Sequence, residues 1–144
     1  MTTPVYKERV LPSAATFMLP VVLGALIFAV LLPINGTLGT WLAVGAISSL
    51  TIVFIFKAPV IEITTTELRV GRARIASEHL GEIEVIAAED AFAARGHLLD
   101  ARAFTCFQAS VRTMLKIEIA DEADPTTYWL FSSRNPQEIK ELLG

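Results

Sequence analysis

The sequence predicts two parts: a membrane-spanning α-helical hairpin, and a small α+β domain whose antiparallel sheet or barrel is closed by a C-terminal helix. The first observation is a run of 47 residues, 10–56, that contains no Asp, Glu, Lys or Arg. The second is the alternation of apolar and polar residues after this run, which is typical of half-buried strands. The third is the charged fraction outside the run, about 28%, which is normal for a soluble domain.

The charge-free run is long enough for two transmembrane helices. A helix rises about 1.5 Å per residue, so about 20 apolar residues cross the roughly 30 Å hydrocarbon core of a bilayer. A turn cluster at 33–37 divides the run, which predicts spans at 14–32 and 38–56. The short connection makes the two helices antiparallel neighbours. We therefore expect a two-helix transmembrane hairpin over 14–56, preceded by a cytoplasmic N-terminal segment, 1–13.

Basic residues flank the predicted hairpin and are absent from its connection. Lys7 and Arg9 precede it and Lys57 follows it. The positive-inside rule therefore predicts a multi-pass protein of the plasma membrane with both termini in the cytoplasm. No small-residue cleavage site follows the first span, which argues against a cleaved signal peptide. The single Cys106 agrees with a reducing compartment, because it can form no internal disulfide.

Small residues recur one helical turn apart in both predicted spans. Ala25 and Ala29 form one such pair, and Gly45 and Ser49 form the other. Small side chains let helix backbones approach closely in lipid. The pairs therefore predict helix packing, either between the two arms of the hairpin or against the helix of a partner. Trp41, near the start of the second span, is typical of an interfacial aromatic residue.

Residues 57–144 form the predicted cytoplasmic domain. Its strands are expected at 60–65, 68–70, 72–75, 82–86, 114–119 and 128–131. A short helix is expected within 87–96, and Phe104 and Phe107 indicate a further strand. The chain ends in a helix, because Asn135 offers an N-cap that is followed by proline at the first helical position.

A curved antiparallel sheet closed by a C-terminal helix is similar to a pleckstrin-homology-like (PH-like) domain. Four blocks carry a second resemblance: Tyr-Lys-Glu-Arg at 6–9, Gly-Arg-Ala-Arg-Ile at 71–75, Asp-Pro-Thr-Thr-Tyr-Trp at 124–129 and Ser-Arg-Asn-Pro at 133–136. With these blocks the chain resembles an uncharacterised family of small actinobacterial membrane proteins, domain of unknown function family 3093. The resemblance implies a two-span anchor with a cytoplasmic PH-like module, and it implies no activity and no catalytic residues.

The residues that could carry catalysis or bind a metal are few and widely spaced. His79, His97 and Cys106 have no spacing typical of a zinc site. The glycines match no phosphate-binding loop, and no serine lies in a nucleophile-elbow motif. We therefore predict a non-enzymatic protein with no catalytic, cofactor-binding or metal-binding residues. A membrane-bound hydrolase or redox enzyme that uses Cys106 or His97 is a remote third alternative.

The predicted cytoplasmic domain has 10 basic and 14 acidic residues, the wrong sign for binding a nucleic-acid backbone. Its local basic feature is formed by Arg69, Arg72 and Arg74. A basic residue near an anionic leaflet contributes about 1 kcal/mol to binding. These arginines therefore predict contact with lipid headgroups or a partner, and the competing interpretation is ordinary charge on a strand surface.

Trp129 and Tyr128 are adjacent in the last predicted strand, so they point to opposite faces of the sheet. One of them belongs to the core, and the other is available for a partner. Trp129 is the residue that we predict as a partner contact, since aromatic residues dominate interface hot spots.

The favoured function is a non-enzymatic, membrane-anchored interaction or scaffold protein, an accessory component of a larger membrane complex. Its expected partners are membrane lipids and an integral membrane protein, with no nucleic acid and no identified small-molecule substrate. The alternative is a PH-like module that senses lipid headgroups at the inner leaflet.

Overall fold

The computed structural model describes residues 3–144, and the chain divides into two compact units. We call residues 11–58 the helical insert. The segment before it, up to Val10, and residues 59–144 together form the sheet domain. Within the expected N-terminal segment 1–13, residues Tyr6–Arg9 form a strand of the sheet domain.

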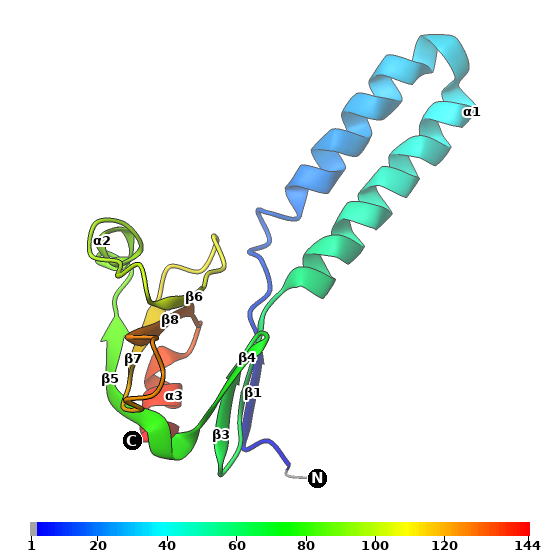
Figure 1. Ribbon diagram of the computed structural model, residues 1–144. Coiled ribbons are helices and arrows are strands. Elements are labelled where there is room, and N and C mark those ends of the chain that lie inside the picture. The colour runs from blue at the N-terminus through cyan, green and yellow to red at the C-terminus, as the bar shows by residue number, and fades with distance from the viewer. Residues whose placement is uncertain (1–2) are drawn as a thin grey trace. The chain divides into compact units, whose positions relative to one another are not determined.

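The helical insert contains one helix, α1 (Met18–Lys57), that is long and apolar enough to cross a membrane. Two separate helices were expected, but here a single residue, Asn35, has non-helical dihedral angles (φ −158°, ψ 101°). Its Oδ1 accepts a hydrogen bond from the Leu38 amide (3.0 Å), as an N-cap side chain does. Asn35 therefore ends one arm and begins the next, and Figure 1 shows the helix turning back on itself at this point.

The two arms of α1 pack on each other through small residues. Its buried residues are Pro20, Gly24, Gly39 and Ala43. A Cβ atom on Gly24 would lie 2.5 Å from the side chain of Ile47 on the other arm, so only glycine fits there without a shift of its neighbour. At the end of the arms away from the turn at Asn35, the rings of Phe17 and Phe54 contact each other, with their centroids 6.2 Å apart.

Along the chain, the helical insert connects the first two strands of sheet 1. This sheet is an antiparallel meander of β1 (Tyr6–Arg9), β2 (Val60–Ile63), β3 (Glu67–Val70) and β4 (Ala73–Ala76), in that order. The Val10 amide donates to the Pro59 carbonyl (2.9 Å), so the two ends of the insert meet at one end of sheet 1. Strand β1 went unpredicted because four residues carry little periodicity.

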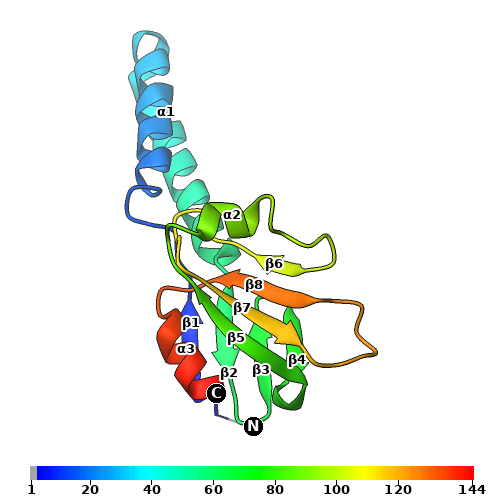
Figure 2. The same ribbon diagram turned by 90° about the vertical axis from the view of Figure 1, so that its left-hand side faces the viewer.

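The second sheet has the order β5-β7-β8-β6, and β6 runs parallel to β8 while the other pairs are antiparallel. The two sheets do not form the closed barrel that was one of the expectations. The short 3₁₀ helix Ser77–His79 carries the chain from sheet 1 into sheet 2, and α2 lies in the crossover that makes β6 parallel (Figure 2). The remaining elements are β5 (Leu80–Ile86), α2 (Ala91–Arg95), β6 (Phe104–Cys106), β7 (Met114–Ile119), β8 (Tyr128–Ser132) and α3 (Pro136–Leu143).

The inner faces of both sheets and the buried side of α3 share one core. Its fully buried side chains include Ile61, Leu68, Ile117, Phe131 and Ile139. A smaller cluster on the other side of sheet 2 is centred on Ala91, Met114 and Leu130. Sheet 2 is therefore covered on both faces, whereas the clusters of buried side chains include no outward-facing residue of sheet 1.

Candidate functional site

Charged side chains line the outer face of sheet 1, the face that points away from the core. The strand register places Lys7 opposite Glu62, Glu62 opposite Arg69, and Arg69 opposite Arg74. We call these four residues the charged row. Residues directly opposite each other on one face of a sheet interact strongly, so one carboxylate is set among three cations.

Glu62 holds two of these cations. Its Oε1 lies 2.8 Å from Lys7 Nζ, and its Oε2 lies 3.3 Å from Arg69 Nη1. The hydrogen bond from Lys7 lowers the pKa of the Glu62 carboxyl, and the charge of Arg69 adds to this effect. Arg69 also donates through Nε to the Gly71 carbonyl (3.3 Å). Arg74 thus faces another arginine, and within residues 3–144 it forms no ion pair of its own.

Two further arginines lie at the end of sheet 1 where the helical insert begins. Arg9 is opposite Val60, and the Gly71 amide donates to the Val60 carbonyl (2.8 Å). Gly71 has a positive φ of 59°, which glycine adopts at no steric cost, and it begins the tight turn between β3 and β4. Arg72 follows in this turn, outside the strand in which the sequence predicted it. We call Arg9, Val60, Gly71 and Arg72 the anchor-side end of sheet 1.

Trp129 is not available as a partner contact. It is 5% exposed and belongs to the shared core, where its ring lies 4.9 Å from that of Phe104. Tyr128 points to the outer face of sheet 2, and its hydroxyl accepts a hydrogen bond from the Asp100 amide (2.9 Å). The sequence predicted that the two residues point to opposite faces of the sheet. The register of β8 decides which one is buried, and it places Trp129, the larger ring, in the core.

A polar cluster that the sequence analysis missed joins two of the blocks quoted for the resemblance. The Glu8 carboxylate accepts hydrogen bonds from the Ser133 hydroxyl (2.6 Å) and the Arg134 amide (2.8 Å). The Tyr6 hydroxyl also donates to Glu8 (3.1 Å), and burial raises the pKa of this phenol. No local pattern signalled it, because Glu8 and its partners Ser133 and Arg134 are 125 and 126 positions apart in the chain. The cluster ties β1 to the start of α3, so we interpret it as a structural clamp.

The residues considered for catalysis or metal binding do not come together. Cys106 lies half-buried in β6, where burial raises the pKa of its thiol. His79 belongs to the 3₁₀ helix after β4, and His97 is exposed after α2. Among residues 3–144, no group of three or more His, Cys, Asp or Glu side chains is placed to hold a metal ion.

The predicted small-residue pairs lie away from the contact between the two arms. Ala25, Ala29, Gly45 and Ser49 are all exposed, and a Cβ atom on Gly45 would meet nothing within 4 Å. Packing between the arms uses a different set of small residues, described above. Of the two alternatives for these pairs, contact with a partner's helix therefore stays a prediction.

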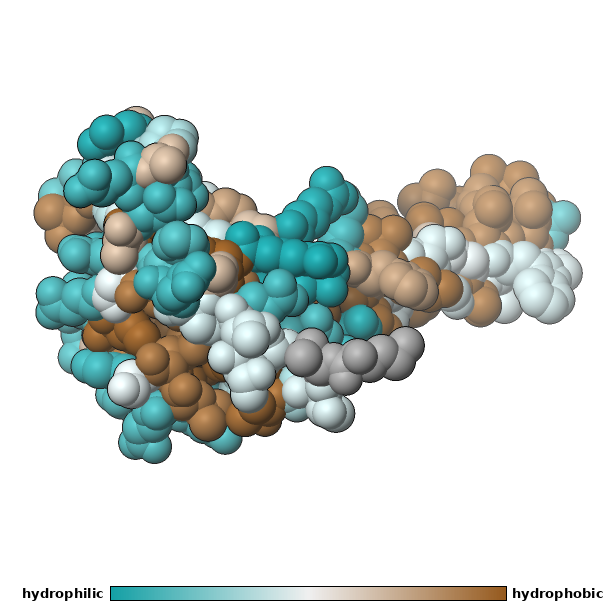
Figure 3. All heavy atoms as spheres, turned by 60° about the horizontal axis from the view of Figure 1, so that its bottom comes forward, coloured by the Kyte–Doolittle hydropathy of each residue, from teal (hydrophilic) through white to brown (hydrophobic). Residues whose placement is uncertain are grey.

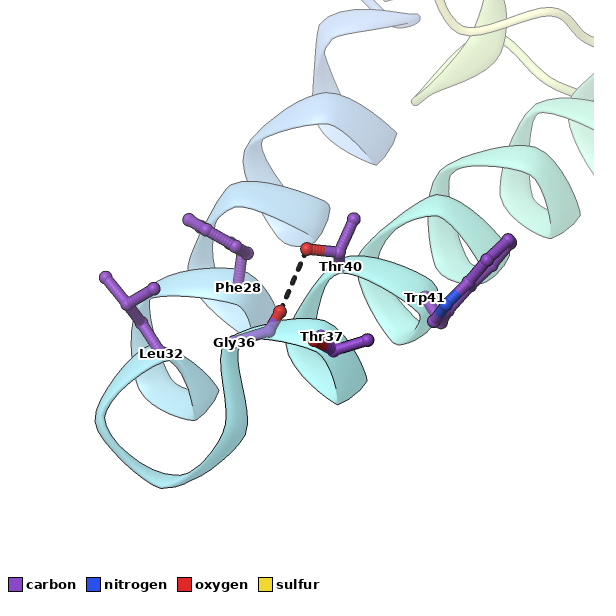
Figure 4. A pocket seen from close by; sticks show the side chains of 6 residues that line it. All are labelled: Phe28, Leu32, Gly36, Thr37, Thr40 and Trp41. Atoms are coloured by element: carbon purple, nitrogen blue, oxygen red, sulfur yellow. Dashed lines mark hydrogen bonds between the residues drawn. The ribbon is translucent and has the colours of Figure 1, made fainter.

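A shallow groove lies at the tip of the helical insert, where α1 turns back (Figure 4). Phe28 and Leu32 of the first arm line it, together with Thr40 of the second arm, whose hydroxyl donates to the Gly36 carbonyl (2.9 Å). The hydroxyl is thus satisfied within its own helix. Trp41 is 72% exposed at this end of α1.

Comparisons with known proteins identify the family but no function. No curated protein and no solved structure matches the chain. A family model described as "Protein of unknown function (DUF3093)" matches residues 5–143. This match spans the helical insert and the sheet domain, including β1, Glu8 and both groups of arginines. The chain therefore belongs to this DUF3093 family of proteins of unknown function.

Proposed function

We propose that this chain is a non-enzymatic, membrane-anchored interaction module, an accessory component of a larger membrane complex. The observation that carries the anchor is the long, exposed apolar surface of α1, and the meeting of Val10 and Pro59 at the base of the helical insert supports two crossings rather than one. A helix that crossed a bilayer once would leave these residues on opposite sides of the membrane, where β1 and β2 could not pair. An insert that enters a bilayer would therefore have to return to the side from which it entered.

The length and surface of α1 support two crossings. The arm 18–34 is about 25 Å long and the arm 36–57 about 33 Å, close to the roughly 30 Å thickness of a hydrocarbon core. Figure 3 shows brown and pale residues over the helical insert and much more teal over the sheet domain. Most large apolar side chains of α1 are exposed, and lipid or a neighbouring transmembrane helix would cover them.

The positions of the basic residues support an inside orientation for the sheet domain. Lys7 and Arg9 precede the helical insert and Lys57 is the last residue of α1, whereas the tip around Asn35 is uncharged. Such a distribution favours a plasma membrane protein with the sheet domain and both termini in the cytoplasm.

We also infer that the sheet domain is PH-like. A four-stranded meander, a second sheet and a C-terminal helix around one core support this assignment. The parallel strand β6 and the insert between β1 and β2 are departures from a simple meander. A PH-like fold serves many functions, so it does not by itself identify a partner.

Cysteine labelling in intact cells tests the two crossings. In a Cys106→Ser background, Thr37→Cys at the tip of α1 is expected to react with a membrane-impermeant maleimide added outside. Glu141→Cys on α3, the matched control, is expected to react only after the cells are permeabilised. A Thr37→Cys variant that also needs permeabilisation would show that the tip does not reach the outer surface.

In-cell crosslinking followed by purification in mild detergent tests the interaction role. A stoichiometric membrane protein partner is expected, and the exposed pairs Ala25/Ala29 and Gly45/Ser49 are the proposed docking positions on the helices. Replacing Ala29 and Ser49 by Leu should then reduce its recovery. A chain that purifies alone, without an enriched neighbour, would argue against an accessory subunit.

The second candidate function is contact with lipid headgroups at the inner leaflet. The exposed arginines of sheet 1 favour it.

A further inference from the structure

We infer that the anchor-side end of sheet 1 binds the phosphate groups of anionic phospholipids, with Arg9 and Arg72 as the first contacts and Arg74 behind them. The inference rests on the proposed membrane anchor, and it deepens the lipid-binding candidate by naming the residues and the ligand. The sequence analysis did not predict Arg9 as a lipid contact. It did predict Arg69, but Arg69 and Lys7 form ion pairs with Glu62 within the sheet.

Covalent connection keeps the anchor-side end close to the membrane. Val60 is three residues after Lys57, the last residue of α1. An extended chain spans at most about 3.5 Å per residue, so Val60 lies within about 10 Å of the end of the helix whatever the angle between the two units. Arg9 is the cross-strand partner of Val60, and the Gly71–Arg72 turn bonds to the Val60 carbonyl. Both arginines therefore stay close to the end of α1 that the proposed anchor places at the headgroups.

The two arginines of the anchor-side end and Arg74 of the charged row are free to bind a ligand. Within residues 3–144, Arg9, Arg72 and Arg74 form no ion pair, and all three are exposed. Lys7 and Arg69 in the charged row are held by Glu62 instead. The side of sheet 1 nearest the anchor thus has unopposed positive charge, and its compensated charge lies one row farther away.

The pairing of Arg69 with Arg74 points to an anion. Like charges placed directly opposite on one face of a sheet destabilise it, and of these two arginines only Arg69 pairs with Glu62. A phosphate group beside Arg74 would relieve this repulsion. Stability is often lower than it could be at sites that bind a ligand.

The outer face of sheet 2 has a net negative charge, opposite to that of sheet 1. The outer face of sheet 2 has Glu82, Glu84 and Glu118 and a single cation, Lys116, which lies 3.6 Å from Glu84. A domain that is basic on one outer face and acidic on the other turns its basic face toward an anionic surface. This charge separation favours a bilayer over a small soluble phosphate, which needs no such orientation.

Lipid binding to the full chain tests the inference. The protein in neutral detergent is titrated with phosphatidylglycerol or with phosphatidylcholine, and bound lipids are counted by native mass spectrometry. The Arg9→Gln/Arg72→Gln variant is expected to bind its first phosphatidylglycerol about tenfold more weakly, with phosphatidylcholine binding unchanged. The charge-matched control Arg102→Gln/Lys140→Gln, which changes an arginine of the α2 crossover and a lysine of α3, is expected to stay within about twofold of the wild type.

Equal phosphatidylglycerol binding by the test and control variants would overturn the inference. Displacement of phosphatidylglycerol by millimolar inorganic phosphate would also overturn it, because the ligand would then be a soluble anion. Arg9→Lys/Arg72→Lys, which keeps the charge, is expected to bind nearly as well as the wild type, and loss of binding there would argue against headgroup attraction. A wild-type chain that alkaline carbonate releases from membranes would refute the anchor itself, a different result from a loss of lipid preference.

Discussion

Sheets 1 and 2 contribute to the same core but differ on their outer faces. Sheet 2 is covered by α2 and a second small cluster around Met114 and Leu130, and its remaining outer surface is acidic. Among residues 3–144, no cluster of buried side chains lies on the outer face of sheet 1, which is basic. Sheet 1, whose first two strands are separated in the chain by the helical insert, is thus the sheet with an exposed charged surface. This difference is consistent with the proposal that sheet 1 makes the contacts of the domain, while both faces of sheet 2 are occupied by packing.

Removing β1 is expected to cause the largest loss of stability in the sheet domain. A fragment of residues 57–144 lacks the fully buried Val10 and the Glu8 clamp, so we expect it not to fold. Joining Val10 to Pro59 through an Asn-Gly turn should instead give a folded domain without the insert, because these residues are already hydrogen-bonded. Circular dichroism and thermal unfolding compare the two fragments, and a cooperative transition in the shorter one would show that β1 is dispensable.

A large-to-small change in the shared core comes next. Phe131→Ala removes a ring that is 0% exposed between the two sheets, and such truncations cost about 3–5 kcal/mol. Phe92→Ala, the matched control, removes a ring of α2 that is 83% exposed and should change stability by less than about 0.5 kcal/mol. Thermal unfolding of the full chain in mild detergent measures both. Similar losses would mean that α2 is as important to the fold as the shared core.

The Glu8 clamp is expected to have an intermediate effect. Glu8→Ala leaves the buried Ser133 hydroxyl and the Arg134 amide without this acceptor, and a lost buried partner costs about 1–3 kcal/mol. Glu141→Ala on the exposed side of α3 serves as the control. Faster hydrogen exchange in β1 and at the start of α3, with no change in β7, would locate the loss. An unchanged exchange pattern would show that the clamp does not hold β1.

The charged row should give the smallest effect, and one that depends on pH. The folded-state pKa of Glu62 is lowered from its usual value of 4.5, so its contribution to stability is present above pH 4.5 and is lost as the pH falls through the folded-state pKa. Glu62→Gln should lower the free energy of unfolding by less than about 1 kcal/mol at pH 7, because the ion pairs are partly exposed. At a pH below the folded-state pKa of Glu62, it should have no effect. Thermal unfolding from pH 3 to 7 checks this. A difference between wild type and variant that does not change with pH would exclude the ion pairs as its cause.

Several elements followed from local sequence alone. Alternation of apolar and polar residues located β7 and β8, and the Asn135–Pro136 start located α3 within a residue. These positions were confirmed because each rests on neighbours along the chain, although Asn135 stands at the N-cap of α3 without a side-chain cap hydrogen bond. The turn within the charge-free run was also visible, since Asn35 needs only the Leu38 amide three residues ahead to cap the second arm.

Tertiary structure decided the features that link distant segments. The pairing of β1 with β2 joins residues about 50 positions apart, and no local pattern in Tyr6–Arg9 indicates that partner. The opposition of Arg69 and Arg74, the burial of Trp129 and the choice of packing face in α1 depend on register and on volume available in the core or between the helices. The sequence by itself thus determined an apolar insert and a strand-rich domain, while the fold determined which charges meet and which stay free, because side chains interact through space rather than along the chain.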